Sequence, residues 1–135
     1  MKNLFVYGTL MFDEVWQKLT TNEYTRTPAV LTHFQRVTVR NETYPAIFRS
    51  IKSHTNGILI HHVSGADIKL LDRFEGNYYR RIQVVVDSNN KKYLADVYVI
   101  KNRFRKILTG MEWFPEEFSH KHIDSFLSRY KNFHS

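Results

Sequence analysis

The chain has 135 residues, of which 42% are hydrophobic and 15% aromatic, and 20 basic against 13 acidic residues give it a net charge of +7. We expect one domain over residues 1–135, with enough apolar side chains for a real core and no tendency to disorder. Cysteine is absent, which excludes disulfide bonds and a thiol nucleophile and is compatible with a reducing compartment.

The positive charge does not by itself indicate a partner. It permits contact with nucleic acid or an anionic substrate, and it also arises as a solubility feature. No stretch comes near the ~18 consecutive apolar residues that a membrane-spanning helix needs. Met1-Lys2-Asn3 runs directly into the strand-like Leu4–Tyr7, which is too short for the core of a signal peptide. We therefore expect a soluble, cytoplasmic protein that makes no membrane contact.

The N-terminal part of the chain predicts a buried strand, a glycine turn and a short helix. Leu4–Tyr7 is an apolar run closed by Gly8. Asp13–Leu19 has acids at its start and a lysine near its end, as a helix prefers. The turn between them, residues 8–11, can point backbone N–H groups into a cavity, where such groups bind anions and oxyanions well. An ordinary tight turn is the alternative.

Extended structure is predicted for residues 29–39 and 57–63. Tyr44-Pro45-Ala46-Ile47 lies between them, after a polar bend at residues 40–42. Because proline lacks the N–H that a central strand needs, this segment is predicted to be an edge or a bulge beside a cleft. Tyr44 either lines that cleft or packs in the core.

An amphipathic helix follows the second of these segments and ends at Gly76, a residue that adopts left-handed conformations without strain. Ser64 is the expected N-cap, with Asp67 three residues on as an approximate capping box. One face of the helix is apolar, with residues at spacing three: Ile68, Leu71 and Phe74. Glu75 then lies at the carbonyl end of the helix, where the negative end of the macrodipole should raise its affinity for a proton. A solvated glutamate at a helix end is the alternative.

The C-terminal part predicts a hairpin and a final helix. Residues 82–86 and 93–100 are strands joined by turn-forming residues, and residues 101–106 form a polar, basic link. Pro115 opens the last helix, whose candidate core contacts are Phe118, Ile123, Phe126, Leu127 and Tyr130. A strand-heavy chain with two or three helices, without strict alternation, indicates an α+β fold.

Several short motifs occur in a fixed order along the chain. They are Val6-Tyr7-Gly8-Thr9-Leu10, Tyr44-Pro45-Ala46, Leu71-Asp72-Arg73-Phe74-Glu75-Gly76 with Tyr79 and Arg81, and then Ala95 and Tyr98. The ordered set resembles the γ-glutamylcyclotransferase-like family, which includes the γ-glutamylamine cyclotransferases and the plant AIG-type proteins. The resemblance covers roughly Leu4 to Tyr98 and implies a small mixed barrel-like sheet with helices packed outside it and a cavity at one side.

The resemblance also implies an activity: cyclisation of the γ-glutamyl group of an amine or amino acid to 5-oxoproline, with release of the free amine. Glu75 is the implied general acid/base, and the implied substrate-binding residues are Tyr7, Gly8, Thr9, Leu10, Tyr44 and Tyr79. The Tyr79 hydroxyl could orient the carboxylate of Glu75 or belong to a buried structural tyrosine. Arg81 could pair with Asp72 at the surface, which is the favoured alternative, or hold an anionic ligand. No metal, nucleotide or other cofactor is required, because the nucleophile is the substrate's own α-amine.

Two departures from the family pattern leave the substrate open. His33 precedes Phe34 where many members carry a glycine, which would alter the bulge of that strand or narrow the cleft. The segment Lys101–Trp113 and the final helix match no family motif, so the leaving group and the oligomeric state stay undetermined.

Other functions are weighed against the enzyme. A non-catalytic module that binds a small ligand on the same fold is the main alternative. The basic segment Lys101–Lys106, with Phe104 inside it, could contact phosphates, but no nucleic-acid recognition motif accompanies it, so nucleic-acid binding is less favoured than a solvated loop. Recognition of an acidic substrate tail is a further option for this segment.

The histidine pattern does not favour a metal site, although there are seven histidines. His61 and His62 are adjacent on a predicted strand and should point to opposite faces. His120 and His122 are two apart on a predicted helix, not the three or four that share a face. Without cysteine or a helical H-x-x-x-H pair, we expect no native metal site.

Overall fold

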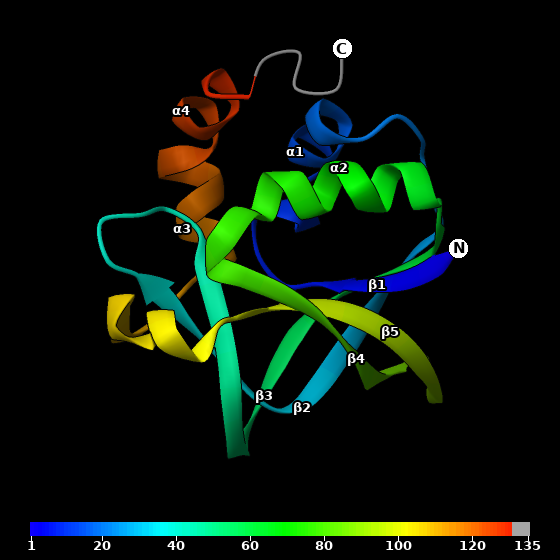
Figure 1. Cartoon of the computed structure of the whole chain (residues 1–135), viewed down its shortest axis with the longest axis horizontal. Helices are drawn as coiled ribbons and strands as arrows, with labels where there is room; N and C mark the ends of the chain where they lie inside the picture. The colour runs from blue at the N-terminus through cyan, green and yellow to red at the C-terminus, as the bar shows by residue number, and fades with distance from the viewer. Residues whose placement is uncertain (131–135) are drawn as a thin grey trace.

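The computed structural model describes residues 1–130, and these have an α+β fold built around one closed sheet (Figure 1). The strands are Lys2–Val6 (β1), Arg26–Val39 (β2), Pro45–Val63 (β3), Tyr79–Ser88 (β4), Lys91–Ile100 (β5) and Leu108–Glu112 (β6). The pairing order is β3-β1-β5-β4-β2, and β2 pairs again with β3, so five strands close into a barrel while β6 extends β2 outside it. β1 and β5 run parallel, and the other pairs are antiparallel.

The helices lie outside the barrel, as predicted. They are Asp13–Leu19 (α1), Gly65–Glu75 (α2) and a C-terminal helical run made of Pro115–Glu117 (α3), a π-helical turn at Phe118–His122 and Ile123–Ser128 (α4). Short 3-10 helices cover Thr9–Met11, Gly76–Tyr78 and Asn102–Ile107. Figure 1 shows α1, α2 and α4 gathered on one side of the barrel. Across residues 1–130 no helix has both the length and the apolar character needed to cross a lipid bilayer.

The core has two parts, one between the helices and the barrel and one inside the barrel. Strand β1 contributes to both, because successive side chains of a strand point to opposite faces. Leu4 and Val6 pack beneath the helices, in a cluster that includes Trp16, Leu71, Phe118 and Phe126. Phe5 and Tyr7 point the other way, into a cluster made of strand residues inside the barrel. Tyr7, the first residue after β1, therefore belongs to the barrel interior and lies where the chain begins to turn.

The two longest strands, β2 and β3, bend together at His33. Thr32 pairs with His54 and Phe34 with Arg49, so four residues of β3 lie opposite the single residue His33. His33 has φ = 69°, a left-handed conformation that glycine adopts most easily, and its Nδ1 lies 2.8 Å from the carbonyl oxygen of Ile51. The bulge is therefore present with histidine in place of glycine.

Three predicted segments differ from the structure. Residues 45–47 and 57–63, predicted as separate extended segments, belong to one strand, β3, because the polar residues between them continue the pairing with β2 around the bulge. The link at residues 101–106 is a 3-10 helix, and it leads into β6, which was not predicted. At His62 a positive φ of 58° interrupts the strand, so the rings of His61 and His62 are 6.3 Å apart and the expected alternation of faces is lost.

We predict that the bulge tolerates glycine and rejects a β-branched residue. His33→Val should lower the free energy of unfolding by about 1–2 kcal/mol, because a β-branched side chain at positive φ clashes with its own backbone. His33→Gly should stay within ~1 kcal/mol of the parent, because relief of strain offsets the lost hydrogen bond. Urea unfolding of the three proteins measures this, and equal losses in both variants would contradict a conformational cause.

Candidate functional site

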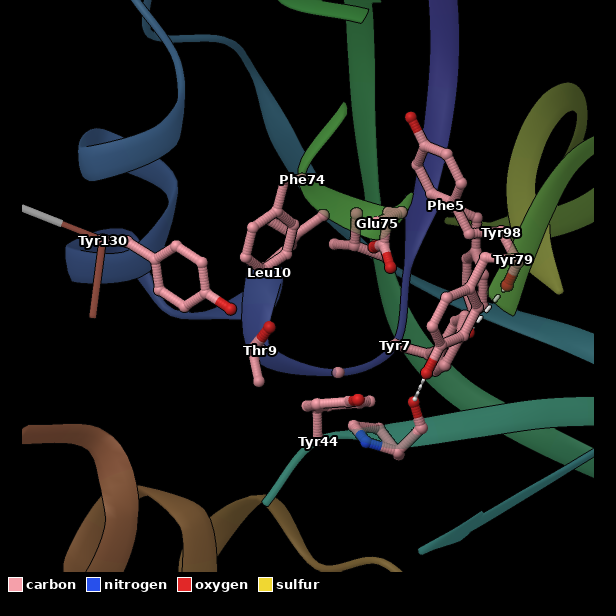
Figure 2. A pocket seen from close by; sticks show the side chains of 13 residues that line it. Phe5, Tyr7, Thr9, Leu10, Tyr44, Phe74, Glu75, Tyr79, Tyr98 and Tyr130 are labelled. Carbon is pink, nitrogen blue, oxygen red and sulfur yellow. Dashed lines mark hydrogen bonds between the residues drawn. The ribbon is translucent and has the colours of Figure 1, made fainter. Parts of the chain in front are cut away.

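A pocket of about 90 Å³ opens where β1 ends, between the C-terminal end of α2 and the last helix (Figure 2). All seven residues assigned to the site from the sequence line it, and they are joined by six others: Phe5, Val6, Pro45, Phe74, Tyr98 and Tyr130. This volume is several times the ~10–15 Å³ that a cavity needs to hold one water, so the pocket has room for a small ligand.

Glu75 is the last residue of α2 and points into this pocket (Figure 2). The helix ends here because Gly76 has φ = 73° and turns the chain away, and its N–H donates to the carbonyl of Asp72. No group in residues 1–130 donates a hydrogen bond to the carboxylate of Glu75. Burial, helped by the negative charge of Asp72, raises the pKa of Glu75 to about 8. The direction agrees with that expected from the helix end, but the causes are burial and a neighbouring charge.

The first of two other acids on α2 fixes the start of the helix. Ser64 accepts a hydrogen bond from the N–H of Asp67, as expected of an N-cap, but the Asp67 side chain does not complete a capping box. It is fully buried and accepts hydrogen bonds from both the N–H and the hydroxyl of Thr21 and, at 2.7 Å, from the hydroxyl of Tyr24. Although burial acts to raise it, these hydrogen bonds lower the pKa of Asp67. The start of α2 is thereby tied to the segment that follows α1.

The second of these acids, Asp72, fixes the other end of α2 to β4 and β5. Its Oδ1 accepts hydrogen bonds from Arg81 Nε at 2.9 Å and from the hydroxyl of Tyr98 at 2.7 Å. Arg81 also pairs with Asp96, so the expected Arg81–Asp72 pair is part of a larger network. Although burial acts to raise it, the hydrogen bonds from Arg81 and Tyr98 lower the pKa of Asp72. Asp72 therefore stays ionised one helical turn before Glu75.

The turn at residues 8–10 faces Glu75 and is held from behind by two arginines. Arg36 Nη1 donates to the carbonyl of Tyr7 at 2.8 Å, and Arg26 Nη2 donates to the carbonyls of Leu10 and Met11 at 3.1 and 3.0 Å. In a trans peptide the C=O and the following N–H point in opposite directions, so fixing the Tyr7 carbonyl also fixes the N–H of Gly8. Residues 9 and 10 begin a 3-10 helix, whose first N–H groups have no acceptor within the helix.

Gly8 is required by packing, not by its backbone angles. A Cβ at this position would lie 2.8 Å from two ring carbons of Pro45, and a proline ring cannot move aside as a flexible side chain can. The glycine therefore lets the turn approach the start of β3 closely. This contact places the Tyr44-Pro45 segment beside the cleft, as its sequence predicted.

Two tyrosines of the pocket, Tyr7 and Tyr79, donate hydrogen bonds from their hydroxyls to backbone carbonyls. The Tyr7 hydroxyl donates to the carbonyl of Tyr98 at 2.6 Å, and the Tyr79 hydroxyl donates to that of Pro45 at 2.9 Å. Tyr79 thus does not orient Glu75 through its hydroxyl, and its buried ring forms part of the pocket wall beside the ring of Tyr44, 6.4 Å away. Burial raises the pKa of Tyr7, Tyr44 and Tyr79 above the ordinary range, so all three stay neutral and act as hydrogen-bond donors.

Sequence reasoning did not assign Phe74 and Tyr130 to the pocket. Phe74 was placed on the apolar face of its helix and Tyr130 among the core contacts of the last helix, and the spacing of neither residue distinguishes a core from a cavity wall. In the structure their rings meet edge to face at 4.9 Å. Figure 2 shows Tyr130 reaching in from the C-terminal side, opposite the tyrosines of the barrel.

The two other sites considered from the sequence are a metal site and the basic segment at residues 101–106. In the part of the chain that the structure describes, no three His, Cys, Asp or Glu side chains are grouped to hold a metal ion. The expectation of no native metal stays a prediction. In the basic segment, Arg103 lies over the ring of Phe104 and Arg105 over that of Phe48, 4.8 Å from the centroid in each case.

Comparison with known proteins agrees with this geometry. The family model described as "Gamma-glutamyl cyclotransferase, AIG2-like" matches residues 4–115, and the chain belongs to this family. The AIG2-like protein D of Arabidopsis thaliana is 31% identical over 136 residues, covering 98% of this chain and 89% of that protein.

Solved structures share the fold. The solution structure of an Arabidopsis thaliana protein superposes with a TM-score of 0.74 at 28% identity, over 98% of this chain and 89% of that one. A structure described as "Gamma-glutamyl cyclotransferase" superposes with a TM-score of 0.65 at 19% identity, over 75% of this chain and 67% of that one, and at that identity the likeness shows the fold alone.

We predict that Glu75 costs stability at neutral pH. An acid whose pKa is raised in the folded state has no effect below its unfolded pKa, where both states are protonated. As pH rises from about 4.5 towards 8, the unfolded state ionises while the folded state stays protonated, and stability is lost. Glu75→Gln should therefore raise the free energy of unfolding by up to about 3 kcal/mol at pH 7 and by almost nothing at pH 4.

Urea unfolding across this pH range measures the difference. Glu14→Gln is the matched control, because Glu14 is an exposed carboxylate on α1. A gain that is independent of pH, or that appears equally in the control, would show that the ionisation of Glu75 is not its cause.

Proposed function

We propose that this protein is a γ-glutamyl cyclotransferase that converts a γ-glutamyl amine or γ-glutamyl amino acid to 5-oxoproline and releases the free amine. The observation that carries the proposal is the carboxylate of Glu75. It lines the pocket, receives no hydrogen bond from residues 1–130 and shares the pocket with a turn whose first backbone N–H groups have no acceptor within their 3-10 helix. Membership of the family supports the same class of reaction.

The γ-glutamyl group is the part of the substrate that fits the pocket. Its carboxylate oxygens or its amide oxygen can accept hydrogen bonds from the N–H groups of residues 8–10, because Arg36 and Arg26 hold the opposite edge of the turn. The rings of Tyr44, Tyr79 and Phe74 provide an apolar wall for its methylene groups. This set contains five of the six substrate-binding residues expected from the sequence; the sixth, Tyr7, also lines the pocket, and its hydroxyl donates to the carbonyl of Tyr98.

The chemistry is an intramolecular acyl transfer. The Glu75 carboxylate accepts a proton from the substrate's α-amino group, and the nitrogen lone pair attacks the γ-carbonyl carbon to form the new C–N bond of a five-membered ring. The carbonyl oxygen becomes an oxyanion, which N–H groups of the turn can stabilise. As the bond to the leaving nitrogen breaks, Glu75 returns the proton to that nitrogen. The nucleophile is supplied by the substrate, so proximity provides much of the acceleration.

The proton affinity of Glu75 suits both halves of this cycle. A general acid/base works best when its pKa is close to the working pH, and the pKa of about 8 is close to neutral. A carboxylate with an ordinary pKa near 4.3 would be a weaker base for an amine and a poor store of a proton for the leaving group. Burial in the pocket therefore supports a proton-carrying role.

The direct test is release of 5-oxoproline from a panel of γ-glutamyl amines and γ-glutamyl dipeptides, measured by mass spectrometry. The purified protein should turn over at least one class, and Glu75→Gln should lower kcat/KM at least ~10²-fold without loss of fold. Glu14→Gln should keep the parental rate. No turnover anywhere in the panel would sink the proposal.

A non-catalytic module is the other reading of the same pocket. It predicts that 5-oxoproline binds equally well to the parent and to Glu75→Gln while neither protein turns over any substrate, so the same panel with a binding titration separates the two. The cytoplasmic location stays a prediction, for which the absence of cysteine is the supporting observation.

We also predict that the charge of Asp72 adds to the effect of burial on the pH at which the enzyme works. The acid limb of kcat/KM should have an apparent pKa near 8 in the parent, because the base form of Glu75 is needed in the free enzyme. Asp72→Asn removes a negative charge that raises this pKa and releases Arg81 from its partner, so the limb should move to lower pH.

Tyr98→Phe is the control for damage to the network. It breaks the hydrogen bond to Asp72 but leaves the negative charge in place, so its acid limb should not move to lower pH. Equal downward shifts in the two variants would assign the effect to lost packing and not to the charge of Asp72.

A further inference from the structure

Under the function proposed above, the γ-glutamyl group binds between Glu75 and the turn at residues 8–10, and the leaving group extends from there along the rest of the pocket lining. The remaining lining residues include Tyr44, immediately before β3, and Tyr130, just after α4. Tyr130 lies beyond residues 4–115, the part of the chain that the family model matches.

A carboxylate lies next to both tyrosines. Glu42 is two residues before Tyr44, and one of its carboxylate oxygens is 4.0 Å from Arg129, the neighbour of Tyr130 in the chain. The same carboxylate raises the pKa of the Tyr44, Tyr79 and Tyr130 hydroxyls, in each case as a smaller effect than burial, so its field reaches the pocket. Its contact with Arg129 is long, and the Arg129 side chain is 59% exposed, so this pair contributes little and can be exchanged for a ligand.

Glu42, Glu112 and Glu117 line a second hollow of about 70 Å³, which begins next to Tyr44 and Pro45 in the chain. Arg129 and Lys121 pair with Glu42 and Glu117 at 4.0 Å, so both ion pairs are long and weak. Aromatic faces beside a carboxylate form the combination that binds ammonium groups best, because the ring quadrupole and the negative charge both attract a cation.

We propose that Glu42, Tyr44 and Tyr130 form a subsite for the leaving amine, and that this subsite selects leaving groups that carry a positive charge. The γ-glutamyl group binds inside, and an ammonium at the far end of the leaving group lies between the two rings and beside the carboxylate of Glu42. A preference in turnover rests on the proposed cyclotransferase activity, whereas binding of an ammonium group at this subsite does not depend on that activity.

The kinetic test uses three substrates of matched length that differ in their terminal group: γ-glutamylcadaverine with an ammonium, γ-glutamylhexylamine with a methyl, and γ-glutamyl-ε-aminohexanoate with a carboxylate. The parent should prefer the ammonium over the methyl substrate in kcat/KM by about three- to tenfold, the range expected of a partly exposed charge with a cation–π contact. Glu42→Gln should reduce this ratio to near one. Added salt should reduce it in the parent.

Further variants isolate the two contributions. Tyr130→Phe should keep the ratio and Tyr130→Leu should lower it, because the ring face and not the hydroxyl attracts the cation. Asp87→Asn is the control for net charge, because it removes one negative charge, as Glu42→Gln does. Asp87 lies near the end of β4, roughly 26 Å along the strand from Tyr79, so this variant should keep the parental ratio.

A binding measurement separates this subsite from the proposed activity. N-acetylcadaverine carries the ammonium without the γ-glutamyl group, and N-hexylacetamide is its neutral counterpart; NMR titration should show tighter binding of the first to the parent and a loss of that difference in Glu42→Gln. If no substrate is turned over but this difference is found, the activity fails and the subsite stands. Turnover without a Glu42-dependent charge preference, or preference for the carboxylate substrate through the basic segment at residues 101–106, overturns the subsite.

Discussion

Helix α2 is anchored at both ends by aspartates, and the rest of the site depends on that anchoring. Asp67 ties its start to the segment after α1, and Asp72 ties its last turn to β4 and β5. Breaking one partner of the buried Asp67 network leaves polar groups without hydrogen bonds, at about 1–3 kcal/mol each, whereas the Asp72 side chain is 42% exposed and its loss costs less. These contacts fix the position of the helix backbone at Glu75, from which its side chain enters the pocket where burial raises its pKa.

The pocket combines three kinds of rigid wall. The turn at residues 8–10 is held by arginines on its outer edge, the tyrosines Tyr7 and Tyr79 are locked through their hydroxyls, and Pro45 packs directly against Gly8. Little reorganisation is needed when charge develops on a ligand in such a site, which is the condition under which hydrogen-bond donors stabilise a transition state most effectively. Glu75 differs from these residues because its carboxylate accepts no hydrogen bond from residues 1–130.

Local signals in the sequence were sufficient to predict the helix and the turn that carry the site. They were insufficient for strands that form only through pairing with residues far away in the chain. The end of α2 at Gly76 and the strand–turn–helix at residues 4–19 follow from turn and cap chemistry, and the structure has both. The sequence did not predict that β3 is one continuous strand, because residues 48–56 become part of it through pairing with β2 around the bulge at His33. β6 was missed for the same reason, since it forms by adding to the edge of β2.

The candidate site shows the same division. The ordered motifs identified the residues contributed by β1, β3, α2 and β4, but a periodic pattern cannot distinguish a side chain that fills a core from one that faces a cavity. Tyr130 looked like any other apolar contact of the last helix. Its place in the pocket follows from where α4 ends relative to α2. The role of Tyr79 was left open between two alternatives, and its hydroxyl bonds to Pro45 in the structure.

The wall contributed by Tyr130 makes the specificity of this scaffold separable from its chemistry. The barrel, α2 and the turn at residues 8–10 lie within residues 4–115, whereas α4 and Tyr130 come after them. If the proposed activity and subsite hold, exchanging the last helix between family members is a direct route to an engineered leaving-group preference, because Glu75 and the turn at residues 8–10 stay unchanged.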